Sequence, residues 1–166
     1  IYMAAIYASG IEPAEKDEAA GETYFEKALQ VNGEATSAFE VGNALKLFNK
    51  HEEAFRFYQR ASELGLGEAT IEVGVMQIEG KGVEKSIEAG VATLQPLADN
   101  GDPKAIREIA IALSDDAFGW DAKGDKQRAL TWIKKWAESG DPQGMTWLSR
   151  QLLHTAETLT ASMIEE

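Results

Sequence analysis

Hydrophobic residues three or four positions apart alternate along this chain with short breaks that contain glycine. Such spacing predicts α-helices, because residues three and four apart share one helical face. In the stretch 61–83, Gly65 ends one helical run, since glycine takes the left-handed conformation at low cost. A second run begins at Ala69, and the loop from Gly80 to Val83 leads to Ser86, which we expect to cap the next helix.

The same order of helix, glycine stop and second helix recurs on both sides of this stretch. The expected helices span residues 1–8, 17–31, 35–48, 51–64, 68–79, 86–100, 103–114, 126–138 and 142–153. We expect the tail, 155–166, to form a last polar helix, because the terminal unit of an array must face water on one side.

Small residues recur at one position of every first helix and indicate an internal repeat. They are Ala4, Gly42, Gly74, Ala110 and Ser149, which lie 32 to 39 residues apart. A period of this length is typical of arrays of helical hairpins. Gly74 lies mid-helix, where glycine costs about 1 kcal/mol relative to alanine. We therefore expect another backbone to come close to Gly74.

The repeat predicts an all-α fold, a right-handed superhelical α/α solenoid of about four and a half helical hairpins. We expect one repeat domain over residues 1–166 and interpret the chain as part of a longer protein, because it begins with Ile1 inside an expected helix. Any targeting signal would then lie outside this sequence. The predicted units are approximately 1–34, 35–68, 69–104, 105–143 and 144–166.

Two junctions resemble those of a known family. The segment Ala98-Asp-Asn-Gly-Asp-Pro-Lys-Ala105 recurs as Ala137-Glu-Ser-Gly-Asp-Pro-Gln-Gly144. With Val73-Gly74 and the turn Gly80-Lys81-Gly82-Val83, these segments resemble the signature of Sel-one-like repeats. The unit 35–68 is more similar to a tetratricopeptide repeat, and both families build the same α/α solenoid.

The resemblance implies a non-enzymatic scaffold that binds a protein or peptide, because most members of these families hold partner proteins. It also implies that the first helix of each unit lines a concave surface. An exposed apolar patch in the middle of that surface would mark a partner site. Burial between neighbouring helices is the alternative, since apolar stripes at helical spacing usually form core. The implied partner-binding positions are Phe39, Asn43, Lys46, Ile71, Val75, Ile78, Arg107, Ile111 and Arg150.

Two further functions stay open. The first is a bacterial envelope module in polysaccharide assembly, secretion or its regulation, because many bacterial members act in the periplasm or at the cell surface. Trp132, Trp136 and Trp147 would then form a carbohydrate-stacking platform, whereas the other interpretation packs them between the fourth and fifth units. The second is a repeat domain attached to an enzyme elsewhere in a longer chain. For localisation we favour the bacterial periplasm or cell envelope.

The loop 115–125 replaces the glycine turn of the other units. It carries four aspartates beside Phe118 and Trp120. We interpret it as a solvated acidic loop, with a partner contact through Phe118 and Trp120 as the second interpretation, since aromatic side chains are favoured interface anchors. The aspartate spacing fits no EF-hand loop, so we expect no metal.

Composition narrows the class of partner. The net charge of −12 over 166 residues argues against nucleic acid and against an anionic membrane surface, since both need a basic face. No hydrophobic run approaches the roughly 20 residues needed to span a bilayer. The chain has no cysteine, which excludes disulfides and thiolate metal sites.

Nothing in the sequence predicts catalysis. The two histidines, His51 and His154, have no partners at the spacing of a triad or a metal pair. The turn Gly80-Lys81-Gly82 lacks the spacing of a phosphate-binding loop. We therefore expect no enzyme activity and no cofactor.

Overall fold

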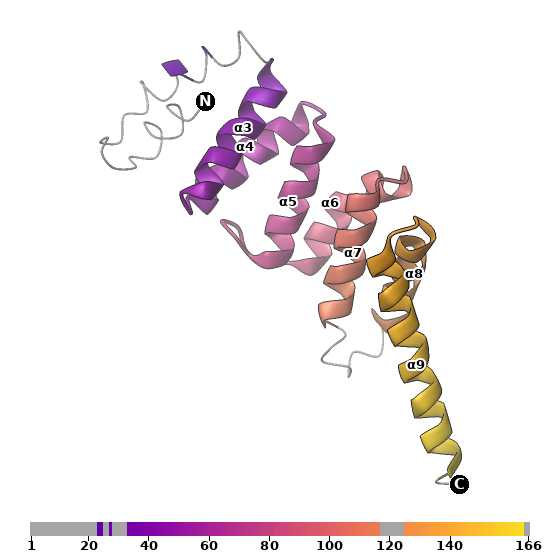
Figure 1. Ribbon diagram of the computed structural model, residues 1–166. Coiled ribbons are helices and arrows are strands. Elements are labelled where there is room, and N and C mark those ends of the chain that lie inside the picture. Colours follow the sequence, from indigo (N-terminus) through magenta and orange to yellow (C-terminus); the bar gives the residue numbers. More distant parts are fainter. Residues whose placement is uncertain (1–22, 25–26, 28–32, 117–124, 165–166) are drawn as a thin grey trace. The chain divides into compact units, whose positions relative to one another are not determined.

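The computed structural model describes residues 23, 24, 27, 33–116 and 125–164 (Figure 1). The expected helix at 1–8, most of the one at 17–31, and the loop residues Phe118 and Trp120 lie outside these residues. The described residues form seven α-helices and no strand, which confirms the all-α prediction.

Successive helices pack as hairpins, α3 on α4, α4 on α5, α7 on α8 and α8 on α9. Their observed ends lie within about two residues of the predicted ones, except at the end of α9. The helices are α3 (Glu34–Leu47), α4 (His51–Glu63), α5 (Gly67–Glu79), α6 (Ile87–Asp99), α7 (Pro103–Asp116), α8 (Asp125–Glu138) and α9 (Pro142–Ile164).

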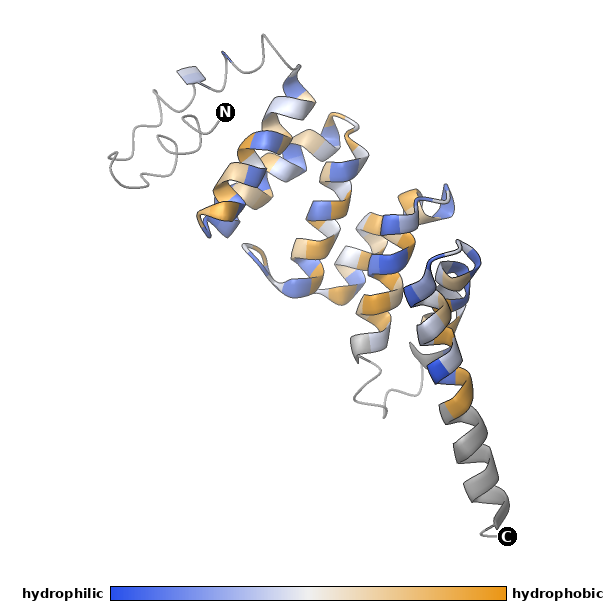
Figure 2. Cartoon of the chain, viewed as in Figure 1, coloured by the Kyte–Doolittle hydropathy of each residue, from blue (hydrophilic) through white to orange (hydrophobic). Residues whose placement is uncertain are grey.

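The chain divides into two compact units, Ile1–Thr93 and Leu94–Glu166, and the boundary falls within α6. We call them the N-terminal part and the C-terminal part and describe each by itself. Figure 2 shows hydrophobic and hydrophilic residues interleaved along α3, α4 and α5. Each of these helices therefore has one face for the core and one for water.

Each part has a core of side chains from neighbouring helices. In the N-terminal part, Val41, Leu45, Tyr58 and Met76 are at most 1% exposed. In the C-terminal part, the same level of burial is reached by Ile109, Leu113, Ile133 and Trp136. The large buried residues come from both helices of a hairpin, as a fold built from α/α pairs requires.

One predicted element is wrong. The tail, 155–166, was expected to form a separate last helix, but α9 runs without a break for 23 residues, Pro142–Ile164. The sequence has no glycine or proline after Gly144. No residue in the tail therefore favours the left-handed conformation or interrupts the helical hydrogen bonds.

The glycine stops are confirmed. Gly65, Gly101 and Gly140 have φ values of +87°, +87° and +85°, in the left-handed region where a side chain would be strained. The predicted cap at Ser86 is confirmed as well, because the Ala89 N–H donates to Ser86 Oγ over 3.2 Å.

In two of these junctions an aspartate directly follows the glycine. The N–H groups of Lys104 and Ala105 both donate to Asp102 Oδ1 over 2.9 Å, at the start of α7. At the start of α9, the Gln143 N–H donates to Asp141 Oδ1 over 2.8 Å. The following proline has no N–H to satisfy and is therefore suited to the first helical position.

Helix backbones in the N-terminal part meet at glycines. A Cβ added to Gly90 on α6 would lie 2.6 Å from the carbonyl oxygen of Gly74 on α5 and would collide with the Ile78 side chain. The expected close approach at Gly74 is therefore confirmed. The glycine-rich turn shows the same constraint, because a Cβ on Gly82 would overlap the backbone carbonyl of His51.

We predict that Gly90→Ala destabilises the N-terminal part by about 1–2 kcal/mol. The added methyl group overpacks the α5–α6 contact at about 2–3 kcal/mol, the upper part of the usual range, because the Gly74 carbonyl belongs to the backbone. The better helix propensity of alanine offsets about 1 kcal/mol. Urea unfolding followed by circular dichroism measures the change. Ala92→Val, at an exposed position of the same helix, is the control and should change stability by less than about 0.5 kcal/mol. Equal stability of Gly90→Ala and the parent chain would contradict the backbone contact.

Candidate functional site

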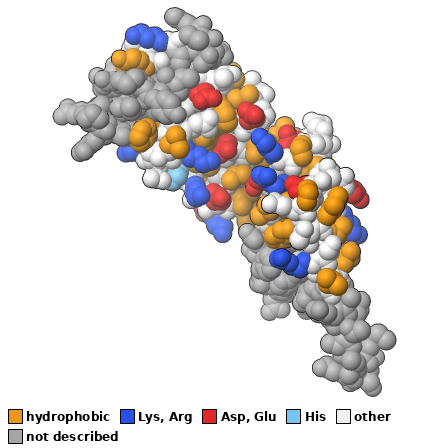
Figure 3. Space-filling view, in the orientation of Figure 1, with side chains coloured by type: hydrophobic (Ala, Val, Ile, Leu, Met, Phe, Trp, Pro, Cys, Tyr) orange, Lys and Arg blue, Asp and Glu red, His pale blue; other side chains and the backbone are white. Residues whose placement is uncertain are grey.

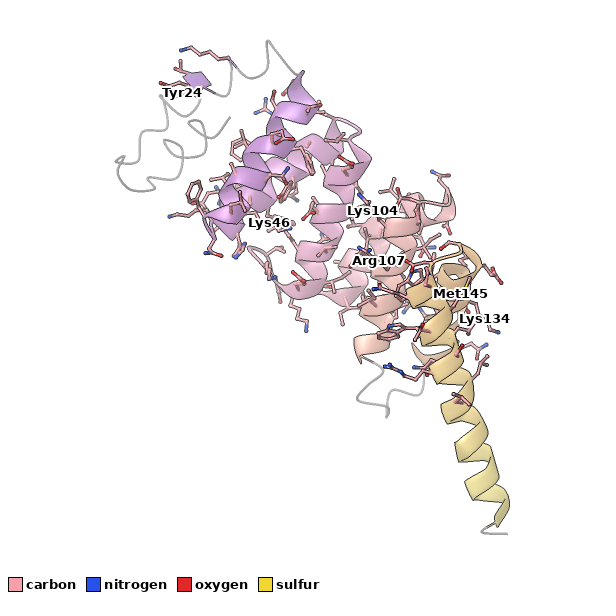
Figure 4. All side chains as sticks on the ribbon, in the orientation of Figure 1. Tyr24, Lys46, Lys104, Arg107, Lys134 and Met145 are labelled. Carbon is pink, nitrogen blue, oxygen red and sulfur yellow. The ribbon has the colours of Figure 1, made fainter. Side chains whose placement is uncertain are left out.

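The first helices of two consecutive repeats, α3 and α5, are linked on one surface by an ion pair. Lys46 Nζ on α3 lies 2.5 Å from Glu72 Oε2 on α5, and these side chains are 42% and 28% exposed. Lys46 lies near the C-terminal end of α3 (Figure 4). We call this surface the α3–α5 face and define it by Phe39, Glu40, Asn43, Lys46, Glu68, Glu72 and Val75.

Asn43 is held in place from beneath by Tyr58 of α4. The Tyr58 hydroxyl donates to Asn43 Oδ1 over 2.9 Å, and Tyr58 is fully buried. The Phe39 ring packs against the Tyr58 ring with 5.6 Å between centroids. Asn43 itself is half-buried, and its NH₂ group has no partner among the described residues. The face therefore presents a fixed amide whose two donors remain available.

Burial raises the pKa of the Tyr58 hydroxyl well above its ordinary value, and the charges of Glu72 and Glu40 raise it further. The hydroxyl consequently stays protonated and remains a donor to Asn43. Tyr58 was not among the predicted contact residues, because it lies on a second helix. The sequence did contain a signal for Tyr58. The equivalent positions on the second helices of the later repeats hold Leu94 and Ile133, so Tyr58 is the one of the three that carries a polar atom.

The predicted apolar stripe is partly covered. Ile71 is only 9% exposed, and Ile78 packs where α6 approaches α5 at Gly90. For Ile71 the structure agrees with burial between helices, whereas Ile78 is half-buried. Val75 and Phe39 are half-buried, so they keep some surface on the α3–α5 face. On the described part of the side shown in Figure 3, hydrophobic, acidic and basic side chains are intermingled.

The remaining predicted contact residues belong to the C-terminal part. Arg107 on α7 (Figure 4) forms an ion pair with Glu108, with 2.7 Å between Nη2 and Oε1. Ile111 is half-buried and Arg150 is exposed. The nine predicted positions are thus divided between the two parts, six in the first and three in the second.

The tryptophans pack into the C-terminal part. Trp136 is 1% exposed, its Nε1–H donates to Asp141 Oδ2 over 2.8 Å, and its ring lies 6.2 Å from the half-buried Trp147 ring. Trp132 is 7% exposed, with Lys135 Nζ 4.2 Å from its ring centroid. The packing interpretation is therefore confirmed for Trp136, which meets Trp147 and Gly144 of α9. Trp132 is buried as well, and neither ring is exposed to a sugar.

The hydrogen bond from Trp136 holds the pKa of the Asp141 carboxyl below its ordinary value, and backbone N–H donors add to the effect. One carboxylate therefore caps α9 through Oδ1 and ties that cap to the core of α8 through Oδ2. A Cβ on Gly144 would lie 2.8 Å from atoms of Trp136 and Ala137, so the first turn of α9 rests on the end of α8.

No group of three or more metal-ligating side chains occurs among the residues that the structure describes. Within the same residues, no helix combines the length and the hydrophobicity required to cross a bilayer. The His51 Nδ1 atom is buried and has no hydrogen-bond partner in the described part of the chain.

Four segments of the sequence match the family model described as Sel1 repeat, over residues 1–30, 41–66, 67–102 and 109–141. The chain belongs to the Sel1 repeat family. The third matched segment includes the glycine turn after α5 and ends at Asp102, within the junction before α7. The comparison with curated proteins gives no match.

Two solved structures resemble this Sel1 repeat chain. A Sel1 repeat protein from Oxalobacter formigenes shares 26% sequence identity at a TM-score of 0.57, over 78% of this chain and 53% of that one. The protein c5321, a protective antigen of uropathogenic Escherichia coli strains with an SLR fold, shares 19% identity at a TM-score of 0.62, over 89% of this chain and 32% of that one. The matched region is thus about half or less of the length of these relatives.

We predict unequal costs for removing the two partners of the Tyr58–Asn43 hydrogen bond. Tyr58→Phe should cost about 1 kcal/mol, because the half-exposed amide can turn to water, whereas Asn43→Ala should cost about 1–3 kcal/mol, because a buried hydroxyl loses its acceptor. Urea unfolding of both variants and of the double variant measures the coupling. If Asn43→Ala were the milder change, the hydrogen bond would not organise the α3–α5 face.

We predict that Asp141→Asn changes how the stability of this Sel1 repeat chain depends on pH. Because the folded-state pKa of Asp141 is lowered, its charge stabilises the fold above the unfolded value of about 3.9, and this contribution is lost as pH falls through the lower folded value. The stability difference between the parent and Asp141→Asn should therefore shrink below pH 4, as measured by unfolding followed through tryptophan fluorescence. Glu138→Gln, an equal loss of charge on the exposed side of α8, is the control. A difference that stays constant with pH would contradict the role of the carboxylate.

Proposed function

We propose that this chain is a non-enzymatic interaction scaffold that binds a protein or peptide segment on the α3–α5 face. The observation that carries the proposal is the Asn43 amide. Its oxygen is fixed by a buried hydroxyl of α4, and its two N–H donors point to no described group. A fixed amide of this kind suits the carbonyl groups of a bound backbone.

Rigidity supports this function. Asn43, Val75 and Glu72 lie on helices whose spacing is set by core packing, so binding would order little on the side of the scaffold. A preorganised surface retains more of its contact energy as affinity, because fewer side chains lose freedom on association. Phe39 and Val75 supply the apolar contact beside the amide.

The alternative functions receive less support. A carbohydrate-stacking platform needs exposed aromatic rings, and Trp132 and Trp136 are buried. An enzyme attached elsewhere in a longer protein is compatible with a chain that matches relatives over about half of their length or less. In that arrangement the α3–α5 face would still act as a docking surface.

Site-specific photo-crosslinking tests the proposal in the source cell. A benzophenone amino acid placed at Val75 should form an adduct with a partner protein, because this position borders the Asn43 amide. The same residue at Arg56, whose side chain is 71% exposed on α4, is the matched control and should give no such adduct. Fractionation into envelope and cytoplasm before analysis also tests the favoured periplasmic or envelope location. Equal adducts from both positions would exclude the α3–α5 face as the docking surface.

A further inference from the structure

We infer that the α3–α5 face selects a cationic segment, a partner stretch in which lysine or arginine side chains flank an apolar anchor. This inference rests on the proposed function of the same face. It adds the chemical class of the partner, which neither the family match nor the fold supplies.

The face carries more acidic than basic side chains. Glu40 and Glu68 are exposed, and no cation pairs with either of them among the described residues. Lys46 is the basic member of the face, and its charge is already paired with Glu72. Among the described residues, two carboxylates without a cation partner therefore remain, one on each helix.

The two carboxylates flank the proposed contact groups. Glu40 lies about one helical turn before Asn43 on α3, and Glu68 lies one turn before Glu72 and two turns before Val75 on α5. The negative field reaches the centre of the face, because Glu72 and Glu40 both raise the pKa of the Tyr58 hydroxyl that holds Asn43. A partner bound at Asn43 and Val75 would thus have acidic groups within reach on both helices.

A cationic segment complements this arrangement, and an acidic one does not. Basic side chains would pair with Glu40 and Glu68 while Lys46 and Glu72 keep their bond. An acidic segment would place like charges beside two unpaired carboxylates and would have to compete with Glu72 for Lys46, so the surface discriminates against it. In an extended segment, alternate side chains are about 6–7 Å apart, which is close to the 5.4 Å rise of one helical turn. Alternate side chains of such a segment can therefore follow successive turns of a helix on the face.

Fluorescence anisotropy with three labelled peptides tests the inference on the intact chain. The peptides are twelve residues long by design, with leucine alternating with lysine, glutamine or glutamate. The lysine peptide should bind at least about fivefold more tightly than the glutamine peptide, because two exposed ion pairs are worth roughly that factor. The preference should fall as ionic strength rises.

Two matched double variants locate the effect. Glu40→Gln with Glu68→Gln should reduce the preference for lysine over glutamine to within about twofold. Glu63→Gln with Glu84→Gln removes the same charge from exposed positions outside α3 and α5, and it should leave the preference intact. Circular dichroism verifies that all variants are folded. Loss of the preference in both double variants would assign it to net charge and overturn the inference.

Val75→Gln separates the inference from the proposed function. If the three peptides bind equally and Val75→Gln weakens all of them, the face is a docking surface without charge selection, and only the inference fails. Preference for the glutamate peptide would overturn the inference in the same way. If no peptide binds, the inference fails, and the crosslinking experiment at Val75 decides the proposed function separately.

Discussion

Contact between backbones at positions without side chains is the constraint on which the N-terminal part depends. At Gly90 and Gly74, α6 approaches α5 so closely that a single methyl group would collide. The turn that joins these helices meets a second such limit where Gly82 lies on the carbonyl of His51, at the start of α4. These contacts fix how far α5 is rotated about its axis, and that rotation decides that Ile71 is buried while Val75 keeps surface.

One hydrogen bond, from Tyr58 to Asn43, connects the core of the N-terminal part to its surface. Tyr58 is as buried as a core residue, yet its hydroxyl donates to Asn43, which belongs to the α3–α5 face. A surface amide fixed by a buried partner is more rigid than one held by solvent, because the partner cannot move without disturbing the core. In the C-terminal part Trp136 and Asp141 are related in a similar way, although there the buried ring fixes a helix cap.

Helix order and helix ends could be predicted from sequence because their signals are local. Glycines 65, 101 and 140 and the aspartate that follows two of them act within a few residues of themselves. The division of the apolar stripe into buried Ile71 and half-exposed Val75 could not be predicted, since it depends on how neighbouring helices rotate and tilt. The partner of Asn43 lay 15 residues away on another helix. The separate helix expected for the tail was wrong because the repeat period was extended into a stretch without a breaking residue.

The Gly-Asp-Pro junction makes the two helix boundaries that carry it, at Gly101 and Gly140, self-sufficient. The glycine ends one helix, the aspartate satisfies the first amides of the next, and the proline leaves no amide to satisfy, all without help from another repeat. A gene segment that encodes one hairpin can therefore be duplicated or deleted without exposing unsatisfied backbone groups at the new joint. Arrays of this kind can change their number of hairpins during evolution while each joint keeps its own chemistry.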